Sequence, residues 1–364
     1  MYITDTPINA ILSIIKLFSF IFQNSYISII QKKSYDKAIQ GGLHMTLKLS
    51  DIQEAQTRIA PYTLKTPLLR LHNLEEYLGC EVYVKLENMQ LTKAFKLRGV
   101  MNTLLQLSDE QLKKGIIASS SGNHGQAIAY GAKMLGIKAI VAVQDTAPTF
   151  KKEKILEHGA EIIPTTVEER FKLTEDLAEE HGYELIHPFN DYRVMAGQGT
   201  IGLEILEQLP DVDQIFVPAS GGGILSGIAT AVKESGSSAK VHGVEPFNLP
   251  KYNVSLKNEE ITKVENKGTI ADGLVTVVPG DKTFPIVEKY VDAFHTATEE
   301  AMKMGQKLLL MEGKILAEIS SSVGIGAVLN KEIEVNPKDK VCFVITGGNL
   351  GFEQLDYIKD IDYK

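Results

Sequence analysis

The sequence predicts an α/β protein in which mostly parallel strands form open, twisted sheets with helices on both faces. Short apolar runs alternate with amphipathic helical segments from about residue 80 to about residue 245, which is typical of parallel sheets. Loops rich in serine and glycine directly follow several of the expected strands. Because ligands bind at the carboxyl ends of parallel strands, these loops are expected to converge on one cleft.

The elements can be assigned in order from periodicity and end signals. A helical pattern begins near Ser50. Ser108 is a typical N-cap with Gln111 three residues later, and glycines follow several helices, as is common at helix ends. The expected strands are 81–86, 116–118, 138–143, 161–163, 183–187, 214–218 and 240–245. The expected helices are 108–114, 124–135, 150–158, 168–181, 200–208 and 224–234.

Bulk composition excludes several classes of protein. The chain has 364 residues, 44% hydrophobic and 23% charged, with a net charge of −8. This balance fits a globular protein and gives no basic surface for nucleic acid. The two cysteines, Cys80 and Cys342, form no CxxC pair, so neither a disulfide framework nor a cysteine zinc site is expected. A reducing cytoplasm is the expected compartment.

Residues 1–44 differ in character from the rest. Residues 11–22 are apolar apart from Ser13, Lys16 and Ser19, which is too short and too interrupted for a spanning helix. No cleavage site typical of a secretory signal follows. We expect a non-catalytic extension or a translation-start artefact, with Met45 as a candidate start, and no membrane association.

Lys96 is the first candidate for chemistry. It lies between Phe95 and Leu97, where a hydrated ammonium is out of place. Apolar surroundings lower the pKa of a lysine amine, as a Schiff-base lysine requires. An aldehyde cofactor is therefore indicated.

Three loops downstream could complete such a site. Ser120-Ser121-Gly122-Asn123-His124 is a strand-to-helix turn whose backbone N–H groups suit a carboxylate, and Ser220-Gly221-Gly222-Gly223-Ile224 opens a helix that could hold a phosphate. The late turn is Thr346-Gly347-Gly348-Asn349. A lysine followed by these loops points to pyridoxal phosphate. A nucleotide fingerprint from Gly221-x-Gly223 and Glu245 competes, but Ser226 replaces its third glycine.

Together, these motifs resemble the fold-type-II pyridoxal-phosphate enzymes, in particular the threonine/serine dehydratase and serine racemase group. The resemblance covers roughly residues 52–351. It implies a tryptophan synthase β-like fold with two sheets, a large domain of residues 45–112 and 186–364, and a small domain of residues 113–185. It also implies a homodimer or higher homo-oligomer.

The resemblance also implies individual roles. The cofactor would be held by Phe95, Lys96, Asn123, Ser220, Gly221, Gly222, Gly223, Ile224 and Thr346. The substrate would contact Ser120, Ser121, Gly122, Asn123 and His124. Asn123 would bond the ring hydroxyl, Thr346 would meet the ring nitrogen, and Lys96 would be the catalytic base.

The function implied is an ammonia-lyase reaction on L-threonine or L-serine, in which β-elimination of the hydroxyl as water is followed by release of ammonia, giving 2-oxobutanoate or pyruvate. The first alternative is serine racemization with Ser121 as the second acid/base, since racemases of the group resemble this chain in having serine there. A nicotinamide oxidoreductase and a binding protein that has lost catalysis remain further alternatives.

Three departures from the family pattern matter. Lys93 and Ala94 stand where Gly-Ser is usual, and Ser220 replaces the first glycine of the phosphate loop. Some members bind a cation through a glutamate resembling Glu245 and an acid a few residues later. Here the later position is Lys251, which puts the cation in doubt.

Overall fold

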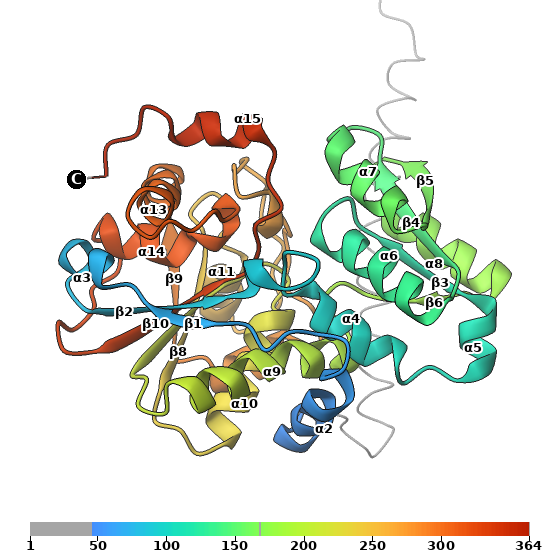
Figure 1. The fold of residues 1–364 in the computed structure, drawn as a ribbon, viewed down its shortest axis with the longest axis horizontal. Helices are drawn as coiled ribbons and strands as arrows, with labels where there is room; N and C mark the ends of the chain where they lie inside the picture. The colour runs from blue at the N-terminus through green and yellow to red at the C-terminus, as the bar shows by residue number, and fades with distance from the viewer. Residues whose placement is uncertain (1–45, 167–168, 364) are drawn as a thin grey trace, which may run out of the picture. The chain divides into compact units, whose positions relative to one another are not determined.

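The computed structural model describes residues 46–166 and 169–363, and the account below concerns these residues (Figure 1). The expected extension of residues 1–44 lies outside them. None of the helices in the described ranges is long and apolar enough to cross a membrane.

Two sheets organise the described fold. The larger has six strands in the order β1-β2-β10-β7-β8-β9, and the smaller has four in the order β5-β4-β3-β6. The pair β1 and β2 is antiparallel, whereas the other paired strands run parallel. The strands are β1 (Leu68–Arg70), β2 (Glu81–Leu86), β3 (Ile116–Ser119), β4 (Ala139–Gln144), β5 (Glu161–Thr165), β6 (Glu184–Leu185), β7 (Gln214–Pro218), β8 (Lys240–Pro246), β9 (Ala293–Ala297) and β10 (Lys340–Ile345).

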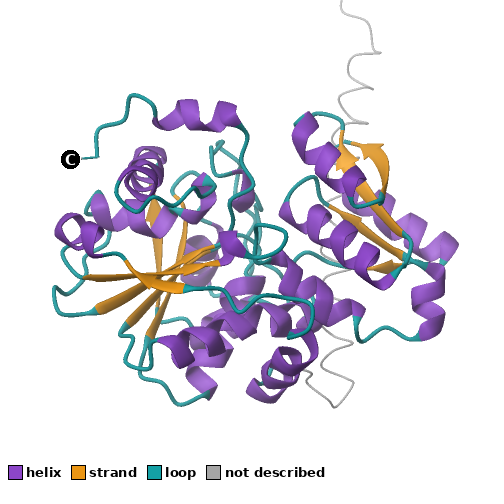
Figure 2. Ribbon diagram, in the orientation of Figure 1, coloured by secondary structure: helices purple, strands orange, loops and turns teal. Residues whose placement is uncertain are grey.

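Helices cover both faces of the large sheet, as Figures 1 and 2 show. One apolar core joins the sheet to α13 and α14, and another joins it to α9 and α10. The helices are α2 (Leu49–Ile59), α3 (His72–Leu78), α4 (Lys96–Leu104), α5 (Asp109–Lys114), α6 (Asn123–Leu135), α7 (Thr149–Glu157), α8 (Arg170–His181), α9 (Tyr192–Gln208), α10 (Gly223–Glu234), α11 (Lys251–Asn258), α12 (Phe284–Tyr290), α13 (Glu299–Met311), α14 (Val323–Leu329) and α15 (Phe352–Leu355).

The α/β class with two mostly parallel sheets is confirmed. Strands 81–86 and 214–218 have the expected bounds, and most other expected elements shift by one to three residues. Ser108 caps α5 by accepting a hydrogen bond from the backbone N–H of Gln111. The expected start of α8, Glu168, lies outside the described residues. The strands of the small sheet all come from residues 113–185, but the division into domains stays a prediction.

The prediction for α9 was wrong at its start. The helix begins at Tyr192, not at residue 200, and Asp191 caps it. Glycines lower intrinsic helix propensity, but those at the start of α9 allow close packing. A Cβ on Gly197 would lie 2.5 Å from the carbonyl oxygen of Arg98 in α4. This contact seats α4, and with it Lys96, against α9.

Candidate active site

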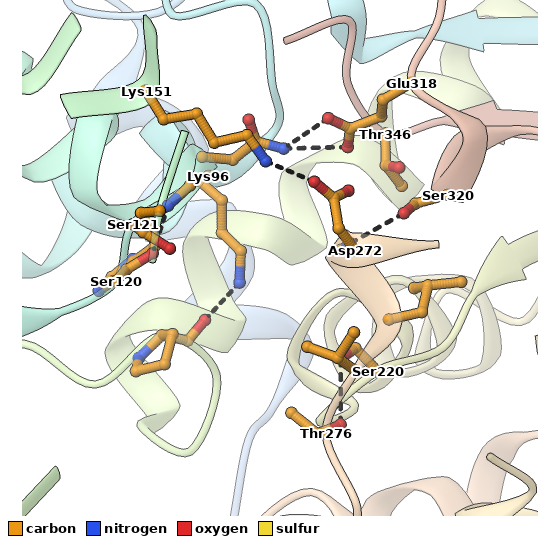
Figure 3. Close-up of a pocket in the computed structure, with 18 of the residues that line it drawn as sticks. Lys96, Ser120, Ser121, Lys151, Ser220, Asp272, Thr276, Glu318, Ser320 and Thr346 are labelled. Atoms are coloured by element: carbon orange, nitrogen blue, oxygen red, sulfur yellow. Dashed lines mark hydrogen bonds and ion pairs between the residues drawn. The ribbon is translucent and has the colours of Figure 1, made fainter. Parts of the chain in front are cut away.

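One pocket of about 1100 Å³ gathers the predicted site residues. It is formed by the loops that follow β3, β7 and β10, together with the start of α4. Figure 3 shows Lys96 in this pocket near Ser120 and Ser121, with Ser220 and Thr346 on other walls. The predicted residues that line it are Phe95, Lys96, Ser120, Ser121, Gly122, Asn123, His124, Ser220, Gly221, Gly222, Gly223, Ile224 and Thr346.

Lys96 is the first residue of α4, and its amine reaches the pocket. Its Nζ donates a hydrogen bond of 2.7 Å to the carbonyl oxygen of Pro188 and lies 5.0 Å from the centre of the Phe95 ring. Burial lowers the pKa of this amine to about 8, although the Glu318 carboxyl acts in the opposite direction. An amine with such a pKa is partly uncharged near neutral pH and can act as nucleophile or base.

Two sets of bonds fix the segment that carries Lys96. The backbone N–H of Phe95 donates to the carbonyl of Thr346 at 3.1 Å, and that of Gly348 donates to the carbonyl of Lys93 at 2.9 Å. Lys93 has a φ of 59°, in the left-handed region. Lys93, which stands where the family usually has glycine, is thus held in a conformation that glycine adopts more easily.

Buried ion pairs anchor α4 two residues further along. Arg98 is 1% exposed and donates to both Glu87 oxygens at 2.8 Å. It also donates to Glu204 at 2.6 Å. A two-pronged guanidinium contact of this kind fixes orientation as well as distance. The direction in which α4 presents Lys96 is therefore set by Arg98.

The serine loop runs from β3 into α6. Gly122 donates its N–H to the Ser120 hydroxyl at 3.2 Å, and the first N–H groups of α6 lack partners within the helix. His124 is 2% exposed and bonds the carbonyl of Ile186 through Nε2 at 2.9 Å. Burial lowers the pKa of His124 to about 3. A neutral histidine in this position holds the loop to the small sheet.

Asn123 connects the serine loop to two other segments. Its Nδ2 donates to both Glu318 oxygens, at 2.9 and 3.0 Å, and its Oδ1 accepts from Asn349 at 2.8 Å. Asn349 also donates to the carbonyl of Thr92 at 2.9 Å. The Asn123 amide is therefore held in one orientation at the pocket wall.

The glycine loop lies between β7 and α10. Gly222 has a φ of 96°, and a Cβ there would collide with the hydroxyl of Tyr252. Glycine is thus required for both backbone conformation and space. The Ser220 hydroxyl is 3.0 Å from that of Thr276. The loop presents the free N–H groups of a helix N-terminus, a suitable site for an anion.

Thr346 begins the third loop, directly after β10, and carries no charge. Its side chain is 4% exposed, and its hydroxyl lies 3.0 Å from the hydroxyl of Ser321. Ser321 also accepts the N–H of Gly347 at 3.0 Å and donates to the carbonyl of the same residue. A neutral, oriented hydroxyl therefore stands at this wall of the pocket.

Glu318, Asp272 and Lys151 are charged residues of the pocket that were not predicted from the sequence. Glu318 is 5% exposed, and burial together with the Asp272 carboxylate raises its pKa to about 7. Asp272 pairs with Lys151 of α7. A single acid between Ala317 and Ile319 was the signal for Glu318. Lys151 gave none, because lysines are common on amphipathic helices.

The geometry excludes the nucleotide fingerprint. Glu245 would have to reach a ribose hydroxyl, but it is 0% exposed. Both of its oxygens accept bonds from the start of α11, from Tyr252 N–H at 3.1 Å and Asn253 N–H at 2.9 Å. Glu245 therefore cannot serve as the ribose-binding acid that a nicotinamide oxidoreductase would need.

Comparisons with known proteins agree with this geometry. The model of the "Pyridoxal-phosphate dependent enzyme" family matches residues 59–347. The chain is 41% identical over 314 residues to an L-threonine ammonia-lyase of Thermotoga maritima, covering 86% of this chain and 78% of that one. It is 40% identical over 319 residues to a serine racemase of Dictyostelium discoideum, covering 86% and 98%. The structure of maize serine racemase superposes with a TM-score of 0.82 at 35% identity, covering 85% of this chain and 96% of that one. The chain belongs to the family of pyridoxal-phosphate-dependent enzymes.

Proposed function

We propose that this enzyme is a threonine/serine dehydratase, an ammonia-lyase that converts L-threonine to 2-oxobutanoate and ammonia, or L-serine to pyruvate and ammonia. The observation that carries the proposal is the Lys96 amine of lowered pKa in one pocket with an anion-binding glycine loop and a serine loop. The similarity to ammonia-lyases at about 40% identity supports the same reaction.

The pocket residues fit pyridoxal phosphate. The amine of Lys96 would bind its aldehyde carbon, and the N–H groups from Ser220 to Ile224 would bind its phosphate. Gly222 is the observation behind this fit, since only a residue without a Cβ keeps the loop seated against the Tyr252 hydroxyl. Asn123 would bind the ring hydroxyl, Thr346 would face the ring nitrogen, and Phe95 would lie beside the ring.

Different residues of the chain then carry out different parts of the elimination. When bound, pyridoxal phosphate supplies an electron sink for negative charge at the substrate Cα. The Lys96 amine accepts the Cα proton as general base. The Ser120 hydroxyl and the N–H groups of the serine loop bind the substrate carboxylate. The β-hydroxyl leaves as water, and a water molecule is consumed again when ammonia is released.

The neutral Thr346 hydroxyl favours elimination over reactions that need a stronger electron sink. A carboxylate beside the ring nitrogen would keep that nitrogen protonated, whereas a hydroxyl does not. Negative charge at Cα is then stabilised less, and the reaction depends on prompt departure of the β-hydroxyl. Threonine and serine both provide this leaving group.

Serine racemization remains the second candidate. Ser121 lines the pocket beside Ser120 (Figure 3), where its hydroxyl is available as a second acid/base. The 40% identity to a serine racemase over nearly all of that protein supports the idea. Racemization requires Ser121 to deliver a proton to the face opposite Lys96.

The first test is a product assay with L-serine and L-threonine, using chiral chromatography and an oxo-acid assay on enzyme loaded with pyridoxal phosphate. We expect oxo acid without D-serine from the wild type, and no turnover from Lys96→Ala. Retained turnover by Lys96→Ala would disprove the assignment of the base. Absence of any product would favour a protein that binds the cofactor without catalysis.

Ser121→Ala separates the two candidate functions. For a dehydratase we expect oxo-acid formation to persist within about threefold, a change below roughly 0.7 kcal/mol in barrier height. For a racemase, D-serine formation would vanish while elimination continues. Equal loss of both activities would show that Ser121 is not a face-specific acid/base.

We also propose a homodimer or larger homo-oligomer in the cytoplasm. Cys80 and Cys342 are both free and buried, which fits a reducing compartment. Light scattering coupled to size-exclusion chromatography would test the assembly, and a monomeric mass would contradict it. Cell fractionation would test the location.

A further inference from the structure

Two oppositely charged side chains are fully buried behind the glycine loop. Lys251, the first residue of α11, and Glu245, near the end of β8, are both 0% exposed. The Lys251 Nζ lies 3.3 Å from Glu245 Oε2 and donates a 2.9 Å hydrogen bond to the carbonyl oxygen of Ala219. Ala219 directly precedes Ser220, so this ammonium touches the base of the loop.

The next residue of α11 holds the same loop further along. The Tyr252 hydroxyl donates to the carbonyl of Gly221 at 3.1 Å, and the Ala219 N–H is bonded to the carbonyl of Val244 in β8 at 2.8 Å. The side chains of two consecutive residues, Lys251 and Tyr252, thus donate hydrogen bonds to the carbonyls of Ala219 and Gly221. Both carbonyls are therefore held on the side of the loop that faces α11.

The Glu245 carboxylate explains why a cation is needed here. It accepts bonds from the N–H of Tyr252 and from the N–H and side-chain amide of Asn253. These bonds fix its position but leave its charge in a buried environment, which is costly without a partner of opposite sign. The Lys251 ammonium is that partner.

We infer that Lys251 is a built-in cation that replaces a bound metal ion, so that the cofactor loop is held without any added cation. A carboxylate and a backbone carbonyl are ligands that suit a hard metal cation. Here the ammonium lies within hydrogen-bonding distance of the carbonyl and within ion-pair distance of the carboxylate, so a metal ion would meet both steric overlap and like charge. Within residues 46–166 and 169–363, no group of three or more His, Cys, Asp or Glu side chains is arranged to hold a metal. Lys251 is a positioning residue, and the inference does not depend on which amino acid is the substrate.

The wild-type holoenzyme provides the first test. After chelation with EDTA, the melting temperature and the rate of pyridoxal-phosphate loss are measured in sodium, potassium, magnesium or calcium chloride at constant ionic strength. We expect both quantities to be the same in every salt. A melting temperature that rises, or cofactor loss that slows, with one particular cation would overturn the inference.

Lys251→Met removes the charge at similar volume, and Lys85→Met is its matched control. Lys85 is also 0% exposed and pairs with Glu204 at 2.6 Å, but its other bonds go to the carbonyl of Thr66 and the side chain of Gln208 and not to the glycine loop. Both variants should melt at lower temperature. Only Lys251→Met should lose the cofactor at least about tenfold faster, equivalent to roughly 1.4 kcal/mol. Equal cofactor retention in the two variants would contradict a role in holding the loop.

Lys251→Asp tests whether the site can be converted into one that binds a metal ion. Two carboxylates and the Ala219 carbonyl would then offer oxygen ligands to magnesium or calcium. We expect this variant alone to melt at higher temperature, and to lose cofactor more slowly, when either ion is added after chelation. A variant that keeps cofactor as tightly as the wild type while ignoring both ions would show that no cation is needed at this place.

Discussion

At the scale of single residues, Glu318 and Lys96 influence each other's charge. Glu318 is almost fully buried, which raises the pKa of its carboxyl to about 7, while its charged form opposes the lowering of the Lys96 pKa. Both oxygens of Glu318 also accept from Asn123. The protonation of the Glu318 carboxyl therefore affects the Lys96 amine and the Asn123 amide of the same pocket.

Glu318→Gln should change the pH dependence of stability. The pKa of Glu318 is about 7 in the folded protein against an ordinary value of 4.5, so the folded state binds the proton more tightly. The stability from this group is fully present below pH 4.5 and is lost as pH rises through about 7, amounting to roughly 3 kcal/mol. We expect the variant, freed of cofactor, to lack this decline in urea unfolding between pH 4.5 and 8.

Glu353→Gln is the matched control, because Glu353 lines the same pocket but is exposed. Its unfolding free energy should follow the wild-type pH profile. A wild-type profile that is flat over this range, or an unchanged profile in Glu318→Gln, would show that Glu318 is already ionised in the folded protein at low pH.

Individual site residues were predictable from the sequence only where their neighbours along the chain pointed to a special role. Lys96 lies between two apolar residues, and the serine and glycine loops follow apolar strands. Glu318 contacts Asn123 across 195 positions of the chain. Such a pairing is created by the fold, and one acid among apolar neighbours does not specify its partner. The same applies to Lys251, whose contact with Ala219 requires α11 to fold back behind the glycine loop.

At the scale of elements, the glycine loop is sensitive to added volume. In Gly222→Ala, the new Cβ would both strain a left-handed residue and press on the Tyr252 hydroxyl. We expect pyridoxal-phosphate affinity to fall at least about tenfold, or roughly 1.4 kcal/mol. Titration of pyridoxal phosphate into the cofactor-free protein, followed by absorbance, measures this affinity.

Gly236→Ala is the control for Gly222→Ala, because it introduces backbone strain without a steric collision. Gly236 has a φ of 75°, but an added Cβ there has no neighbour within 4 Å. This control should lose about 1 kcal/mol of stability from strain alone and keep its cofactor affinity. If both variants bind the cofactor equally well, the contact with Tyr252 does not shape the loop.

Elements with strong periodicity and end signals were predictable, and α9 shows why others were not. Residues 196–200 contain two glycines, which lower intrinsic helix propensity. In the structure, Gly197 lets α9 approach α4 at the backbone of Arg98. Tertiary contact thus outweighs local preference, and no local pattern carries that information.

At the scale of the whole molecule, the order of strands brings the site together. Strand β10, near the end of the chain, lies between β2 and β7. Its loop therefore meets both the Lys96 segment, which follows β2, and the glycine loop, which follows β7. The sequence predicted parallel strands with loops at one edge, but not this order, because strand order depends on packing between distant segments.

Removal of residues 1–44 should leave a folded, active enzyme. The pocket residues that the structure describes lie between Phe95 and Tyr357, and the core of the described residues begins with Leu47, which is 1% exposed. We expect the truncated chain to keep its melting temperature and to keep kcat/KM within about twofold, roughly 0.4 kcal/mol.

Deletion of residues 1–52 is the contrasting case, because it also removes Leu47 and Ile52, two buried side chains worth about 1.5–3 kcal/mol each. That shorter chain should unfold at markedly lower urea concentration. An insoluble or inactive product from the first deletion would show that the extension contributes to the folded enzyme.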